Sequence, residues 1–166
     1  MGEPIREPRR AHRPRGKPSI AKIGRGLPTQ RCDEAPSPEF LRGIKEFNRR
    51  EFFECHETLE ALWIEETDPL RYLYQGILQV GVGFYHLRRG NYKGALSLLQ
   101  RGLRLLQPFA RGCLGVDVAR LESEAHACRQ RLLVLGPERF PEFDEALIPR
   151  VLFKESAEGE SAALAT

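Results

Sequence analysis

The chain has 166 residues, of which 41% are hydrophobic and 30% are charged, and its formal net charge is +3. This length suits one modest domain with tails and excludes a large multidomain enzyme. No run approaches the ~18 apolar residues that a membrane-spanning helix needs, and the N-terminus lacks the apolar block of a secretory signal. We therefore expect a cytoplasmic protein that makes no membrane contact.

The basic residues are concentrated at the N-terminus. Residues 1–31 carry nine Lys or Arg against two Glu, and the first 38 residues hold seven of the twelve prolines. A basic, proline-rich composition with little to bury predicts a disordered tail over residues 1–36. Three functional alternatives stand beside that interpretation: a targeting peptide, for example for a plastid, an upstream extension from a misassigned start, and an arm that contacts nucleic acid or an acidic protein. The arm would use Arg9, Arg10, Arg13 and Arg15, whose side chains bind phosphates without reading sequence.

Five helical segments are predicted after the tail, because apolar residues recur at steps of three and four. They cover residues 37–48, 52–63, 70–89, 92–107 and 117–136. Ser37-Pro38, Asp68-Pro69 and Asp117 are typical helix starts, and Gly90-Asn91 and Gly136-Pro137 are typical helix ends. Residues 48–50 are polar, and the pattern leaves open whether a turn occurs there. The sequence thus predicts an all-α, compact bundle of about five helices over residues 37–136.

The chain after this domain has two parts of different composition, one apolar and one polar. Residues 137–153 are too apolar for a free linker and are expected to pack on the domain or on a partner, which would be a second copy in a homo-oligomer. Residues 154–166 are small and polar and are expected to be disordered.

The four cysteines give no sign of a cysteine-based site. Cys32, Cys55, Cys113 and Cys128 contain no C-x-x-C pair, which argues against a zinc knuckle and a small disulfide scaffold. We expect reduced thiols.

The densest group of polar residues lies in the second segment. His56 and Glu60 stand one helical turn apart on the same side as the apolar residue Trp63. Burying such groups is costly unless each has a hydrogen-bond partner, a metal or contact with solvent in a cleft. A second polar line, Gln75, Gln79 and His86, follows one face of the central segment. If the two helices pair, the two lines meet in a pocket.

Three interpretations of this pocket remain open. A divalent metal would be held by His56, Glu57, Glu60 and His86. Alternatively, Glu60 would orient His56 as a general base, which at most makes the protein hydrolase-like and leaves open whether it is an enzyme. The third interpretation is a buried network of these side chains that fixes helix register.

Two stretches of the chain resemble one known family. The first runs from Phe47-Asn48 through Phe52-Phe53-Glu54-Cys55-His56-Glu57 to Leu59-Glu60 and Trp63, and the second includes Gly76-Ile77-Leu78-Gln79 and the segment from His86 to Ala95. Together they resemble domain of unknown function family 309, over about residues 38–107. The resemblance implies a small all-helical domain and no particular activity. Where the family usually has a small residue, this chain has Arg50.

The resemblance sets the candidate site. The family's characteristic positions fall on Asn48, His56, Glu57, Glu60, Trp63, Gln79, His86, Gly90 and Asn91. With Gln75, the candidate pocket is therefore Asn48, His56, Glu57, Glu60, Trp63, Gln75, Gln79 and His86. The functional hypothesis is a polar pocket between the second and third helices that binds a metal or a small ligand. The alternative is a non-enzymatic module that docks a partner helix, with the basic tail adding electrostatic attachment.

Overall fold

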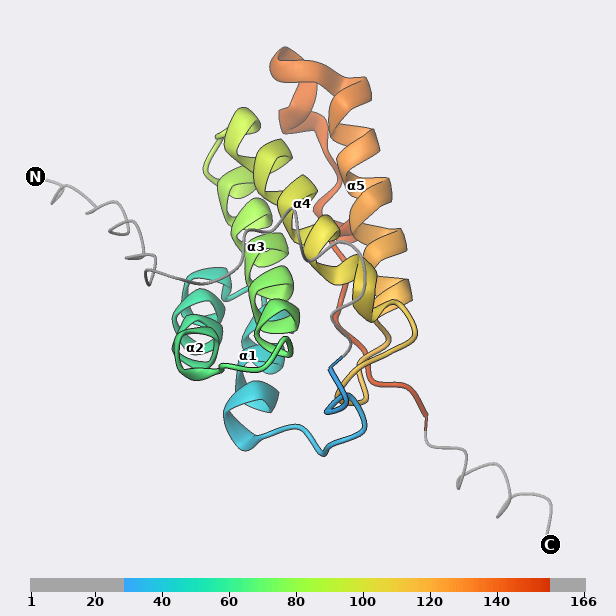
Figure 1. Ribbon diagram of the computed structural model, residues 1–166. Helices are drawn as coiled ribbons and strands as arrows, with labels where there is room; N and C mark the ends of the chain where they lie inside the picture. Colours follow the sequence, from blue (N-terminus) through green and yellow to red (C-terminus); the bar gives the residue numbers. More distant parts are fainter. Residues whose placement is uncertain (1–28, 156–166) are drawn as a thin grey trace, which may run out of the picture.

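The computed structural model describes residues 29–155, and these residues form an all-α fold (Figure 1). The helices are α1 (Pro38–Asn48), α2 (Phe52–Glu65), α3 (Arg71–Arg88), α4 (Tyr92–Leu106) and α5 (Val118–Arg139), with short 3-10 turns η2 (Gln107–Phe109), η3 (Phe140–Glu142) and η4 (Glu145–Leu147). Isolated β-bridges occur in the described part of the chain, but no strand does. The predicted fold class is confirmed.

Local sequence signals place the helix starts. The Ser37 hydroxyl accepts a hydrogen bond from the Phe40 amide at the start of α1, and Asp117 accepts one from the Arg120 amide at the start of α5. Each side chain satisfies one of the amides that a helix N-terminus leaves without an internal partner. Between α1 and α2 the chain makes a turn, in which Arg50 has a φ of 65°. The sequence pattern alone did not decide whether a turn occurs here.

Helix α3 is the centre of the bundle, with α2 on one side and α4 on the other (Figure 1). The contact with α4 is close because small residues face each other. A Cβ atom at Gly102 of α4 would lie 2.9 Å from the carbonyl oxygen of Gly76 in α3, and one at Gly83 would lie 2.9 Å from Leu99 Cγ. This approach offsets the loss of helix propensity at the glycines of α3.

Helix α2 runs antiparallel to α3. The ring centroids of Phe53, near the start of α2, and Tyr85, near the end of α3, are 6.4 Å apart. At the opposite end the Arg71 guanidinium lies 5.2 Å from the centroid of the Trp63 ring. The middle of α2 therefore faces the middle of α3.

The C-terminal segment, residues 143–154, returns along α5 towards the loop that precedes it (Figure 1). Phe143, Ile148 and Val151 are buried against the rest of the chain. The Asp117 amide donates to the Leu152 carbonyl at 2.8 Å, which joins this segment to the start of α5. These three residues thus pack within one chain, whereas Leu147 and Phe153 of the same segment are 51% and 41% exposed.

A disulfide between Cys32 and Cys113 corrects the expectation of four reduced thiols. It ties the segment before α1 to the loop between α4 and α5, across a sequence separation of 81 residues. The Leu114 amide also donates to the Cys32 carbonyl at 2.7 Å. Spacing alone could not indicate this pair, because the fold brings the two cysteines together. Cys55 and Cys128 are free and buried.

Candidate functional site

The candidate polar residues of α2 and α3 are not joined to one another by hydrogen bonds within residues 29–155. His56, Glu60, Gln75 and Gln79 are all half-buried, and within residues 29–155 none of them bonds to another. The Oε1 atom of Gln79 is buried without a hydrogen-bond partner among the described atoms, and so is Nε1 of Trp63. The predicted register network is therefore not formed in this conformation.

The predicted metal shell is not assembled either. Over the part of the chain that the structure describes, no three His, Cys, Asp or Glu side chains are grouped so that they could hold a metal ion. His86 contacts Asn91 instead: its Nδ1 atom is 3.2 Å from Nδ2 of Asn91, at the C-terminal end of α3. Glu57 is exposed. Within the described residues, His56, Glu57, Glu60 and His86 are therefore not grouped as a ligand set, and their role as metal ligands stays a prediction.

His86 and Asn91 stabilise the turn between α3 and α4. Asn91 caps α4 by accepting a hydrogen bond from the Gly94 amide at 2.9 Å, and its side-chain amide nitrogen faces His86. Burial, with a smaller effect from Arg89, lowers the pKa of His86. A neutral imidazole accepts the Asn91 hydrogen bond at Nδ1, whereas an imidazolium cannot. These two family positions are explained by folding.

Asn48 and Arg50 hold the C-terminal segment, and we call this pair the C-terminal clamp. The Asn48 side chain donates to the Val151 carbonyl at 2.9 Å and accepts from the Val151 amide at 2.7 Å. The Arg50 guanidinium donates to the carbonyls of Ile148 at 2.7 Å and Pro149 at 2.8 Å. Its left-handed backbone is strained for a residue with a Cβ atom, and the two bonds offset that strain. The hydrogen bonds of the Asn48 side chain therefore go to the C-terminal segment and not to His56.

Arg71, which is buried, and Trp63, which is half-buried, form a pair at the other end of α2. Arg71 is only 5% exposed, and its guanidinium lies over the rings of Trp63 and Tyr72, at 5.2 and 5.7 Å from their centroids. Aromatic faces attract a cation through their quadrupole, and the attraction is stronger where water is excluded. Trp63 thus acts as a structural anchor between α2 and α3.

One face of α2, at the edge of its contact with α3, is partly exposed. Phe53, Glu57, Glu60 and Ile64 follow one another at steps of four, three and four, so they share this helix face. We call these four residues the α2 ridge. Phe53, whose ring also lies 6.4 Å from that of Tyr85, is 46% exposed, and Ile64, at the other end of the ridge, is 57% exposed.

The α2 ridge lies in a strongly acidic stretch. Residues 51–70 contain seven Asp or Glu and no Lys or Arg. Among the described residues, Glu51, Glu54, Glu57, Glu60 and Glu65 form no ion pair. The sequence-based interpretation considered only Glu57 and Glu60 of these residues, as metal ligands, and not the charge of the whole stretch. The signal was the absence of any Lys or Arg over twenty positions.

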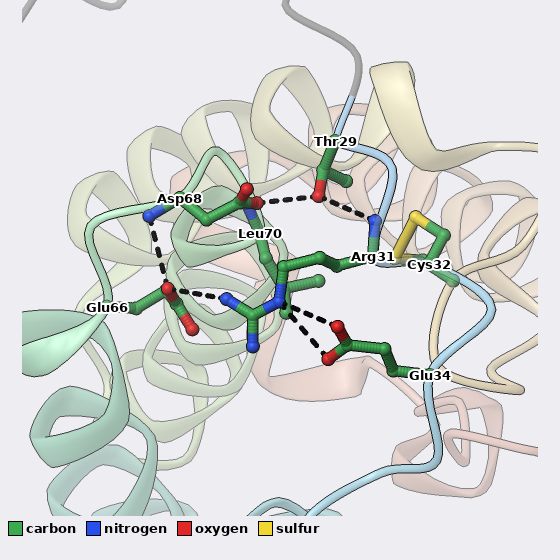
Figure 2. Close-up of polar contacts among 8 residues, drawn as sticks. Thr29, Arg31, Cys32, Glu34, Glu66, Asp68 and Leu70 are labelled. Carbon is green, nitrogen blue, oxygen red and sulfur yellow. Dashed lines mark hydrogen bonds and ion pairs between the residues drawn. A yellow bond between two sulfur atoms is a disulfide. The ribbon is translucent and has the colours of Figure 1, made fainter.

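Two other acidic residues of this stretch are occupied by the chain's own N-terminal segment. Thr29 donates to Asp68 Oδ1 at 2.6 Å, and the Arg31 guanidinium lies 2.8 Å from Glu66 Oε1 (Figure 2). Asp68 also accepts from the Leu70 amide at 2.8 Å. Burial alone would raise the pKa of Asp68, but the hydrogen bonds from Thr29 and Leu70 and the charge of Arg31 lower it. We call Thr29, Arg31, Glu66 and Asp68 the N-terminal clasp.

A hollow of about 430 Å³ lies away from α2, between α5 and the C-terminal segment. Arg120, Glu124, Cys128 and Arg150 line it, and Arg120 is paired with Glu124. Burial, followed by the charge of Glu124, raises the pKa of the Cys128 thiol to about 11. Burial likewise raises the pKa of Cys55 to about 12, ahead of the effect of Glu46. Neither thiol is activated as a nucleophile.

Comparison with known proteins gives a family match within the bundle. Residues 40–98 match the family model described as "Domain of unknown function (DUF309)". The expected resemblance is confirmed. This DUF309 segment runs from α1 into α4 and contains the α2 ridge.

One curated relative is "Uncharacterized protein YpuF" of Bacillus subtilis (strain 168), which is 43% identical over 75 residues. The match covers 43% of this chain and 43% of the relative, so the chain matches less than half of the relative's length. No solved structure matches.

The remaining predictions concern the tail and membranes. Arg9, Arg10, Arg13 and Arg15, expected to contact nucleic acid or an acidic protein, lie outside the described residues. Among residues 29–155, no helix has the length and apolar character to cross a membrane.

Proposed function

We propose that this helical domain is a non-enzymatic interaction module whose α2 ridge docks a basic, amphipathic segment of a partner. The observation that carries the proposal is the α2 ridge itself, in which two exposed apolar side chains flank two carboxylates that have no ion-pair partner among the described residues. Charge complementarity selects a basic partner, and the apolar side chains supply the area that drives association.

The other hypotheses have less support. A catalytic or metal pocket needs its polar groups to converge, whereas His56, Glu60 and Gln79 make no hydrogen bonds to one another within residues 29–155. The grouping of three ligands that a metal would need is also lacking there. The docking hypothesis needs no such convergence, because Glu57 and Glu60 already lie together on the α2 ridge.

A peptide titration tests the proposal. The probe is a synthetic 18-residue amphipathic helix of Leu and Lys, labelled with a fluorophore, and its anisotropy is followed as full-length protein is added. We expect saturable binding that weakens as salt rises, because exposed charges are screened. The double variant Glu57→Lys and Glu60→Lys is expected to lose at least about tenfold in affinity, since like charges then face each other.

A matched variant controls for overall charge. Glu138, near the end of α5, and Glu155, after the C-terminal segment, are exposed and form no ion pair within the described chain. The double variant Glu138→Lys with Glu155→Lys therefore changes the net charge equally, and it is expected to bind the probe like the wild type. Equal losses in the two double variants would show that net charge, and not the α2 ridge, governs binding, and the proposal would then be wrong.

A further inference from the structure

The chain carries a segment with the composition that the α2 ridge would dock. Residues 17–27 contain Lys17, Lys22 and Arg25 and no acidic residue. Between the charges stand three apolar residues, Ile20, Ile23 and Leu27, in a tail that otherwise has almost nothing to bury. The α2 ridge presents the complementary set, two carboxylates between two exposed apolar side chains.

The described part of the chain begins beside α2. Thr29 is bonded to Asp68 and Arg31 is paired with Glu66, so the chain is fixed just past the C-terminal end of α2 by the N-terminal clasp (Figure 2). The disulfide of Cys32 holds the same segment one residue further on. Residues 17–27 therefore end two positions before an anchor on the acidic stretch.

The length of this segment is sufficient for the whole α2 ridge. Helix α2 has 14 residues, and at about 1.5 Å per residue it is about 21 Å long. The eleven residues 17–27 can span up to about 36 Å when extended, at about 3.3 Å per residue. A segment tethered this closely also has an effective concentration on the order of millimolar at its site.

We infer that residues 17–27 bind the α2 ridge of their own chain and thereby compete with a partner for it. The inference rests on the proposed function, because it names the regulation of the same surface. Lys22 and Arg25 pair with Glu57 and Glu60, continuing the contact that Arg31 makes with Glu66, and Ile20, Ile23 and Leu27 cover the exposed apolar side chains. The module is autoinhibited until a partner segment displaces its own.

The test uses the full-length chain and two variants that lose the same charge. In the first, Lys17, Lys22 and Arg25 are each changed to Gln. In the second, the matched control, Arg6, Arg9 and Arg10 are each changed to Gln. The probe is the Leu/Lys peptide described above. We expect the first variant to bind it at least about fivefold more tightly than the wild type, and the control to bind it within about twofold.

The fluorescence of Trp63 gives an independent reading, because it is the chain's one tryptophan and it is half-buried on α2. With no peptide added, quenching by acrylamide is expected to increase in the first variant and to stay unchanged in the control. Quenching of the wild type should increase with salt and be independent of protein concentration, as an intramolecular contact requires.

Carbodiimide coupling locates the contact. In the monomeric wild-type chain we expect an amide link from Lys17 or Lys22 to Glu57 or Glu60, identified by mass spectrometry. Links only to acidic residues elsewhere, such as Glu138, would overturn the inference.

The outcomes separate the inference from the proposed function. If the peptide binds in a manner that depends on Glu57 and Glu60, but the two tail variants behave alike, the module stands and autoinhibition is wrong. If no chain binds the peptide, the proposed function fails, and the quenching and cross-links still decide whether the tail lies on the α2 ridge.

Discussion

The two ends of the described chain and the α2 ridge use polar residues in opposite ways. At the ends, every polar side chain of the C-terminal clamp and the N-terminal clasp has a partner on a distant part of the chain. On the α2 ridge, Glu57 and Glu60 have no ion-pair partner among the described residues, and Phe53 and Ile64 are exposed. The polar residues at the two ends are therefore explained by folding, whereas those of the α2 ridge remain available for binding.

The largest effect is expected from the disulfide at the N-terminal end. Reducing Cys32–Cys113 opens a loop closed across 81 residues of separation, and chain-entropy arguments put the loss in the free energy of unfolding at about 4 kcal/mol. Urea denaturation with and without a dithiol reductant measures it. A variant with both cysteines changed to Ser should match the reduced wild type and should not respond to the reductant.

A smaller loss is expected when Asn48 of the C-terminal clamp is changed to Ala. The change leaves the amide and carbonyl of Val151, a residue that is 1% exposed, without their partner. Two lost hydrogen bonds at a buried site predict a decrease of about 2–3 kcal/mol in the free energy of unfolding. Asn48→Asp keeps the acceptor for the Val151 amide, and its free energy of unfolding should lie between those of the wild type and Asn48→Ala. A decrease below about 0.5 kcal/mol would show that the clamp does not hold the C-terminal segment.

Two substitutions of Arg50 test the backbone strain, because they are expected to differ in stability in a defined order. Arg50→Ala loses the bonds to Ile148 and Pro149 but keeps the left-handed φ of 65°, and we expect a loss of about 2 kcal/mol. Arg50→Gly loses the same bonds but relieves the backbone strain, so it should be more stable than the Ala variant by about 1 kcal/mol. Equal stabilities in urea denaturation would contradict the assigned strain.

His86 predicts a pH dependence. Its pKa is lowered in the folded chain, so the unfolded chain binds the proton more tightly. The stability it contributes is complete above the unfolded value of about 6.5 and is lost as the pH falls towards the folded value. Burial of the imidazole, with a smaller effect from the charge of Arg89, is the physical cause of this loss. Unfolding at pH 7.5 and pH 5 should show this loss in the wild type and a smaller one in His86→Gln.

The sequence predicted what depends on neighbouring residues. Ser37 and Asp117 cap helices because each acts on an amide three residues away, and the all-α class follows from the apolar spacing. The disulfide and the contacts of Arg50 join residues far apart in the chain, and nothing local indicates them. For a related reason, the sequence could not predict which residues of the candidate site would bond to one another. A shared helix face shows which side chains can meet, but hydrogen bonds depend on the register and distance between two helices.

The binding role of the α2 ridge can be decided by measuring two quantities, the free energy of unfolding and the affinity for the Leu/Lys peptide, for Glu57→Lys with Glu60→Lys and for Asn48→Ala. We expect the first variant to keep its stability within about 0.5 kcal/mol and to lose binding by at least about tenfold. We expect Asn48→Ala to lose stability and, under conditions where it is folded, to keep its affinity. An α2 ridge variant that unfolds more easily while binding the peptide normally would contradict the claim that this face is for binding.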